Sequence, residues 1–316
     1  MKPFRIRVGD AALDDLRARL RRARRPGVLT DGDAYGVDPR DLRDLCAYWA
    51  DGFDWRRIEG ELNEIPQFTA TIEGRRLHFA WIRSPEPGAH PLVLLHGWPG
   101  SFREFRRMIG PLTDPRAHGV DPADAFDLVV PSLPGYLFSE PSDDPGYDYR
   151  RVAGAVAALM ESLGYARFGA AGGDAGAAVA AWLGADFPKH LSGIHLTTVL
   201  VGRPPGGGDP MDGVTAEEAE ALRVHREVFL AEQAAHLEIQ GTRPQTLAYA
   251  LEDSPVGLAA WFLDKVRMWS DPETPIDRDE ILTNLTLYWA TGSVASSMRY
   301  YHAVRHGAGR FFPDRR

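Results

Sequence analysis

The spacing of hydrophobic residues divides the chain into three regions. Up to residue 67 the spacing is mostly helical, with Leu13, Leu16 and Leu20 on one face of a predicted helix. From Phe68 onward, hydrophobic and polar residues alternate, which is the pattern of half-buried strands. After residue 210 the pattern is helical again. We therefore expect a helical lead-in, a core that contains a sheet, and a second helical region.

The central region alternates strands with helices. Continuous apolar runs at 91–95 and 126–131 are typical of strands that are covered on both faces. Strands that alternate with helices predict a mostly parallel sheet wound with helices on both faces, whose active site lies beyond the carboxyl ends of the strands. The predicted strands are 69–72, 77–82, 91–95, 126–131, 167–170 and 193–198, and the predicted helices are 102–109, 149–164 and 174–187.

The region after residue 210 predicts helices only. A Pro/Gly-rich linker at 202–210 precedes it, and Thr215 with Glu218 forms a capping box. The segment 311–314 resembles the beginning of a return to the sheet. We therefore expect an inserted helical lid, with helices at 215–238, 244–251, 255–269 and 277–305.

Composition and charge narrow the class of protein. The chain is 44% hydrophobic and 25% charged, as in ordinary soluble proteins. Its single cysteine, Cys46, excludes an intrachain disulfide and a cysteine-based metal cluster. Residues 1–25 carry charge where a signal peptide needs an apolar segment, and no apolar run reaches the length of a membrane span. We expect a cytoplasmic protein.

The net charge of -8 is unevenly distributed. Residues 1–30 hold nine Lys/Arg and three Asp, so the rest of the chain is acidic. Because the arginines share a helix with an apolar face, we interpret them as a solvated surface rather than a nucleic-acid contact.

Asp174 is the first candidate for chemistry. It lies between small residues in Gly172-Gly173-Asp174-Ala175-Gly176, where a predicted strand turns into a helix. A turn of this kind can push a side chain out above the sheet, as in the nucleophile elbow, here with aspartate in place of serine. The alternative is a Gly-rich turn with an aspartate that caps the helix. This stretch alone leaves both interpretations open.

Several motifs together resemble the microsomal-type epoxide hydrolases of the α/β-hydrolase superfamily. The resemblance extends over nearly all of the chain, and it implies a lead-in (1–67), an α/β-hydrolase core (68–201), a helical lid (202–310) and the start of a return to the core (311–316). The motifs are Gly52-Phe53-Asp54-Trp55, Pro66-Gln67-Phe68, His96-Gly97-Trp98-Pro99-Gly100-Ser101, the Asp174 turn, Asp253-Ser254-Pro255-Val256-Gly257-Leu258-Ala259-Ala260-Trp261 and Leu287-Tyr288-Trp289-Ala290-Thr291-Gly292.

The resemblance implies that Asp174 is the nucleophile. An ionised carboxylate can attack a strained epoxide carbon directly, and the start of a helix favours the anion. The alkyl-enzyme ester is then hydrolysed to a diol, with backbone N–H groups of Trp98 and Ala175 expected as the oxyanion hole. The resemblance gives His96 the role of supporting that loop rather than of the general base.

The lid of this family supplies two tyrosine proton donors, and a tyrosine suits this task because it stays protonated at neutral pH. One of the two positions matches Tyr301, whose alternative role is core packing, whereas Tyr300 points elsewhere on the helix. The other position holds His236, which is either a second donor or an ordinary lid histidine.

The general base and its relay acid have no counterpart in this sequence. In the family they follow two strands beyond the lid, and those strands are absent before Arg316. No Asp or Glu occurs at 195–203, the other place where the superfamily keeps a relay acid. The family geometry argues against His302 or His306 as substitutes. A missing terminal segment and an impaired homologue that binds epoxides without turnover both remain open.

The expected substrate is a small apolar epoxide, because the lid is rich in Trp, Leu and Phe. No cofactor, metal or nucleic acid is expected, and a homodimer is compatible with the sequence. Haloalkane dehalogenases share an aspartate nucleophile but lack this lead-in, and a serine esterase is disfavoured because Asp174 occupies the serine position.

Overall fold

A computed structural model describes residues 1–27, 32–198, 209 and 211–307. Its centre is a seven-stranded mixed sheet in the order β1-β2-β3-β5-β4-β6-β7, in which only β1 and β3 run against the other strands. The strands are β1 (Lys2–Phe4), β2 (Gln67–Ile72), β3 (Arg75–Ile82), β4 (His90–Leu95), β5 (Phe126–Pro131), β6 (Phe168–Gly172) and β7 (Leu191–Leu196).

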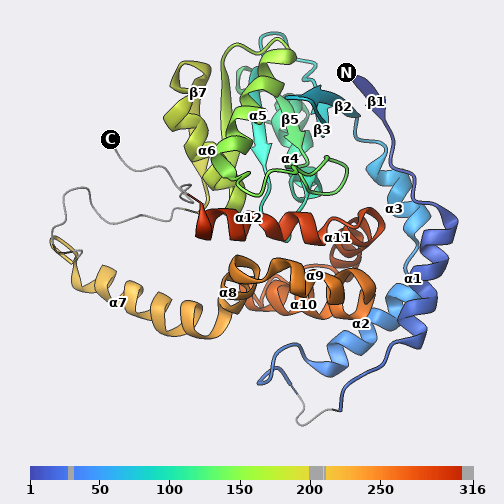
Figure 1. Ribbon diagram of the computed structural model, residues 1–316. Helices are drawn as coiled ribbons and strands as arrows, with labels where there is room; N and C mark the ends of the chain where they lie inside the picture. The colour runs from blue at the N-terminus through green and yellow to red at the C-terminus, as the bar shows by residue number, and fades with distance from the viewer. Residues whose placement is uncertain (28–31, 199–208, 210, 308–316) are drawn as a thin grey trace.

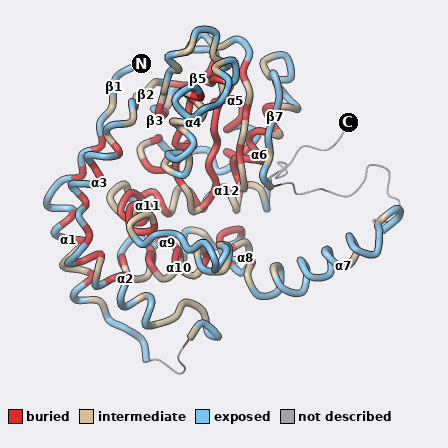
Figure 2. Tube along the Cα trace, turned by 180° about the vertical axis from the view of Figure 1, so that it is seen from behind, coloured by how far each residue is buried: buried red, intermediate tan, exposed pale blue. Residues whose placement is uncertain are grey.

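The parallel strands β5, β4, β6 and β7 form the core (Figure 1). Val93 and Leu95 of β4 have no exposed surface, as the continuous apolar run predicts. Helices contact these strands and buried residues concentrate between them (Figure 2). These helices are α4 (Arg106–Thr113), α5 (Tyr149–Ser162) and α6 (Asp174–Asp186), with short 3₁₀ helices η1 (Phe102–Phe105), η2 (Pro115–His118), η3 (Pro122–Asp124) and η4 (Pro188–His190).

Three lead-in helices run along one side of the molecule from the sheet to the lid (Figure 1). They are α1 (Asp10–Arg22), α2 (Pro39–Asp51) and α3 (Trp55–Leu62). Leu13, Leu16 and Leu20 are buried, and Arg19 and Arg21 pair with acidic side chains. The basic face of α1 is therefore at the surface, as predicted, and the structure adds ion pairs there.

The lid lies below the carboxyl ends of the parallel strands in Figure 1, with α12 between the sheet and the other lid helices. Its helices are α8 (Ala235–Thr242), α9 (Pro244–Asp253), α10 (Pro255–Trp269), α11 (Arg278–Thr291) and α12 (Val294–His306). The segment formed by α7 (Ala216–Val224) and the π-helix η5 (His225–Gln233) extends away from the body (Figure 1).

Several predicted boundaries are wrong. The helix expected over 277–305 is two helices, because Gly292 adopts the left-handed conformation that ends α11. The helix expected over 215–238 becomes a π-helix at His225 and breaks near Ala234. The helix predicted from residue 102 opens with the 3₁₀ turn η1.

The last predicted strand lies two residues earlier than expected. It is β7, and it is the edge strand among the described residues. Ile194 is 46% exposed, so the strand is not covered on both faces. Most of the linker at 202–210 and the return at 311–316 lie outside the described residues.

Candidate active site

Asp174 lies on a sharp turn between β6 and α6. Its φ angle is 49°, a left-handed conformation that a non-glycine residue rarely adopts. The helix N-cap is Gly173, and the Asp174 side chain is not used as the cap. The capping interpretation is therefore wrong, and the turn presents a carboxylate beyond the carboxyl end of β6.

The loop after β4 and the start of α6 both meet the Asp174 carboxylate. The backbone N–H of Trp98, after β4, donates to Asp174 Oδ1 at 2.8 Å. Burial raises the pKa of Asp174 above its ordinary value, and hydrogen bonds from the Trp98 and Ala175 N–H groups oppose that rise. The two donors expected from the sequence therefore both lie at the Asp174 carboxylate.

The lid brings Tyr301 and His236 against Trp98. The ring centroids of Trp98, Tyr301 and His236 are each 5.8 Å from the other two, and His236 stacks nearly flat on Trp98. Burial, and then the charge of Asp174, raise the pKa of Tyr301 well above its usual value. Tyr301 therefore keeps its proton at neutral pH and can donate it.

His236 is neutral in this environment. Burial, and then the charge of Lys265, lower the pKa of His236 to about 4. Its Nδ1 atom is buried without a hydrogen-bond partner in the described structure. A neutral imidazole can donate one hydrogen bond, but it is a weaker acid than imidazolium.

His96 joins the loops that follow β4 and β5. Its Nε2 accepts the Leu133 N–H at 3.1 Å, and its Nδ1 lies 3.0 Å from the Gly97 carbonyl oxygen. Burial lowers the pKa of His96 to about 4. Both ring nitrogens are thus occupied by the backbone, which agrees with a supporting role for this histidine.

The C-terminal histidines of α12 lie together. His302 and His306 stack with ring centroids 4.1 Å apart, and His306 Nδ1 contacts the His302 carbonyl. His302 directly follows Tyr301 in the chain, and His306 lies one turn beyond it, at the end of the helix. Within the part of the chain that the structure describes, neither histidine is hydrogen-bonded to Asp174, so we assign neither as the general base.

Sequence reasoning missed the residues that fasten the lid to the core loops. Tyr288 of α11 donates its hydroxyl to the Gly100 carbonyl at 2.9 Å, and Asn284 donates to the Pro99 carbonyl. Tyr300 donates to the Pro134 carbonyl at 2.6 Å. Tyr288 lies within the motif at 287–292, which was its only signal in the sequence, whereas no motif contained Asn284.

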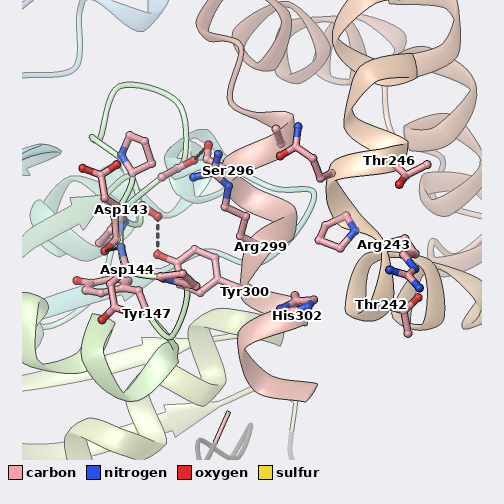
Figure 3. Close-up of a pocket in the computed structure, with 18 residues that line it drawn as sticks. Asp143, Asp144, Tyr147, Thr242, Arg243, Thr246, Ser296, Arg299, Tyr300 and His302 are labelled. Atoms are coloured by element: carbon pink, nitrogen blue, oxygen red, sulfur yellow. Dashed lines mark hydrogen bonds between the residues drawn. The ribbon is translucent and has the colours of Figure 1, made fainter. Parts of the chain in front are cut away.

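Two cavities flank this site. One of about 400 Å³ lies between the core loop at 134–147 and the lid, and Arg243, Arg299 and Tyr300 help to line it (Figure 3). The other, of about 350 Å³, is lined by the 99–107 segment and by α10 and α11. Neither cavity is lined by Asp174 or Tyr301.

Two other kinds of feature are absent from the residues that the structure describes. No cluster of three or more His, Cys, Asp or Glu side chains there could hold a metal ion. No helix there is both long and apolar enough to cross a bilayer.

Comparisons with known proteins show the family of this chain. The family model for the epoxide hydrolase N terminus matches residues 1–105, and that for the alpha/beta hydrolase fold matches residues 90–221. The chain is 36% identical over 330 residues to epoxide hydrolase 1 of Oryctolagus cuniculus, across 95% of this chain and 72% of the relative.

Two solved structures are similar over the same extent. The epoxide hydrolase of Aspergillus niger has a TM-score of 0.85 and 34% identity, covering 95% of this chain and 78% of that one. The juvenile hormone epoxide hydrolase of Bombyx mori has a TM-score of 0.86 and 33% identity, covering 96% and 76%. The chain has the α/β-hydrolase fold and belongs to the epoxide hydrolase family.

Proposed function

We propose that this chain opens an epoxide by attack of the Asp174 carboxylate on a ring carbon. The single observation that supports this most strongly is the turn at Asp174, where a strained backbone presents a carboxylate whose Oδ1 is bonded to the Trp98 N–H. A residue held in an unfavourable conformation at such a turn is typical of a functional site.

The first step uses one residue of the core and one of the lid. A carboxylate oxygen of Asp174 forms a bond to the ring carbon while the carbon–oxygen bond of the epoxide breaks. The alkoxide oxygen takes the proton of the Tyr301 hydroxyl, which leaves a phenolate and an alkyl ester. His236 is a second candidate donor beside Tyr301, and its neutral state limits it to a hydrogen bond.

The second step is attack of water on the ester carbonyl. The Trp98 and Ala175 N–H groups are the proposed donors to the oxyanion that forms there. A base must take a proton from that water, and none is assigned among the described residues, since both nitrogens of His96 face the backbone. We therefore propose that ester formation is faster than ester hydrolysis in residues 1–316.

The aromatic side chains at the site favour an apolar substrate. Phe262 lies 5.6 Å from Trp98 between ring centroids, and Trp269 lies 4.8 Å from His236. These rings and Tyr301 would surround the non-reacting part of an apolar epoxide.

Intact-mass spectrometry after mixing with styrene oxide tests this proposal. We expect a single persistent adduct on the 316-residue chain, and no adduct on Asp174→Asn. Asp127→Asn, which alters a buried aspartate bonded to Ser84 and Tyr165, is the matched control and should still form the adduct. An adduct that persists in Asp174→Asn would refute the nucleophile, and rapid multiple turnover of the wild type would reveal a base that remains unassigned.

A further inference from the structure

Gln240 of α8 is a buried polar residue for which the mechanism above has no role. Its side chain has no exposed surface. Trp261 Nε1 of α10 donates to Gln240 Oε1 at 3.1 Å. Because the indole N–H can only donate, it must face the amide oxygen, and this bond fixes which way the carboxamide points.

The NH₂ group of Gln240 consequently points away from Trp261. No described residue accepts a hydrogen bond from it. A buried donor without a partner is costly, so such a group in a native site calls for an explanation. Gln240 also lies one helical turn after His236 on α8, so both residues are on the face that packs on α12.

The candidate acceptor for this NH₂ group is the Tyr301 hydroxyl, because α8 packs on α12 and the ring of His236, one turn before Gln240, lies 5.8 Å from the Tyr301 ring. Burial and Asp174 raise the pKa of Tyr301, and the Gln240 side chain acts in the opposite direction. A group that lowers a phenol pKa stabilises the phenolate, which is how a donor at the phenol oxygen behaves. Hydrogen bonds of this kind are often long before the substrate arrives and shorten in the reacting complex.

We propose that Gln240 is a positioning residue for the proton donor, with its NH₂ group donating to the Tyr301 oxygen. This role rests on the proposed function. Because the oxygen then accepts from Gln240, the Tyr301 O–H is left to point toward the epoxide oxygen. After the proton has moved to the alkoxide, the same N–H stabilises the phenolate, which regains a proton when water hydrolyses the ester.

Three substitutions separate this role from simple packing. Gln240→Leu keeps a side chain of similar size but removes the donor, and we expect adduct formation to slow roughly tenfold. Trp261→Phe leaves the amide in place but unanchored, so a smaller loss is expected. Gln245→Leu changes an exposed glutamine on α9 and is the matched control, with adduct formation unchanged.

Gln240→Glu supplies a readout that packing would not give. An ionised carboxylate cannot donate a hydrogen bond, whereas a protonated carboxyl can. We expect adduct formation by this variant to recover as the pH is lowered, relative to Gln240→Leu at each pH. Asp174, His236, Lys265 and the buried Tyr149 and Tyr288 also surround the donor, and both variants share them, so the ratio isolates residue 240.

The outcomes distinguish the two proposals. If the wild type forms no adduct at all, the proposed function fails. If the wild type forms the adduct and Gln240→Leu forms it at the same rate, only the role of Gln240 is refuted. A Gln240→Glu variant that is slow at every pH, in step with Gln240→Leu, would also refute it.

Discussion

At the scale of single residues, the site combines a carboxylate that is hard to keep charged with side chains that are hard to ionise. Burial raises the pKa values of Asp174 and Tyr301, while the Trp98 and Ala175 N–H groups favour the Asp174 anion. These environments suit Asp174 to the proposed role of nucleophile and Tyr301 to the proposed role of proton donor. In this proposal the two roles differ because the two side chains have different surroundings, since neither residue type is unusual.

Buried neutral histidines make stability depend on pH. Burial lowers the pKa of His78 to about 3 and that of His96 to about 4, below the unfolded value of about 6.5. The unfolded chain therefore binds more protons between these values, so stability is full above pH 6.5 and falls as the pH drops toward 4. We expect His96 to contribute up to roughly 3 kcal/mol of this loss.

Urea unfolding between pH 7.5 and 4.5 would measure this dependence. His96→Gln should reduce the slope of unfolding free energy against pH, because glutamine does not titrate. His306→Gln, at the exposed end of α12, serves as the control and should leave the slope as in wild type. An unchanged slope in His96→Gln would contradict the assignment.

At the scale of elements, the decisive contact is between α6 and β4. A Cβ atom on Gly176 would lie 1.9 Å from the Leu95 carbonyl oxygen, which is backbone and cannot rotate away. We expect Gly176→Ala to cost about 3 kcal/mol or more, and to abolish soluble expression if the margin of stability is small. Thermal unfolding or the soluble yield would measure the loss.

The control for this substitution lies in the neighbouring strand. A Cβ atom on Gly193 of β7 would have no heavy atom within 4 Å. Gly193→Ala should therefore unfold within a few °C of wild type. If the two variants unfolded at the same temperature, the close approach of α6 to β4 would not limit stability.

The sequence predicted elements well where a pattern was local. The hairpin at β2 and β3, the buried strands β4 and β5, and the cap at Thr215 are confirmed. It failed where tertiary contacts decide, as at Gly292, whose left-handed turn splits a segment of unbroken helical periodicity. The sequence also did not indicate Gln240. It becomes a candidate positioning residue only through its neighbours Trp261 and Tyr301, which are distant in sequence.

At the scale of the whole molecule, the lead-in joins the lid to the core. Trp49 Nε1 of α2 donates to Thr286 Oγ1 of α11 at 2.9 Å, and Arg57 of α3 pairs with Asp279 of the same helix. The other end of the lead-in, β1, pairs with β2 in the sheet. The lead-in therefore sets where α11 stands over the core.

We expect the buried hydrogen bond between α2 and α11 to contribute more to the stability of the fold than the partly exposed ion pair between α3 and α11. Thr286→Val removes the acceptor and leaves the Trp49 N–H buried and unpaired, at a cost of about 1–3 kcal/mol. Asp279→Asn weakens a partly exposed pair and should cost less than about 1 kcal/mol. Denaturant unfolding of both variants measures the difference, and the reverse order would overturn this view of the interface.

Two adjacent tyrosines of α12 contact two different loops of the core. Tyr300 donates to the Pro134 carbonyl in the loop after β5, whereas Tyr301 lies against Trp98 in the loop after β4. This part of α12 is thus attached directly to the core. An evolving lineage could exchange side chains on α9 to suit new epoxides, while the proposed proton donor Tyr301 kept its alignment with Asp174.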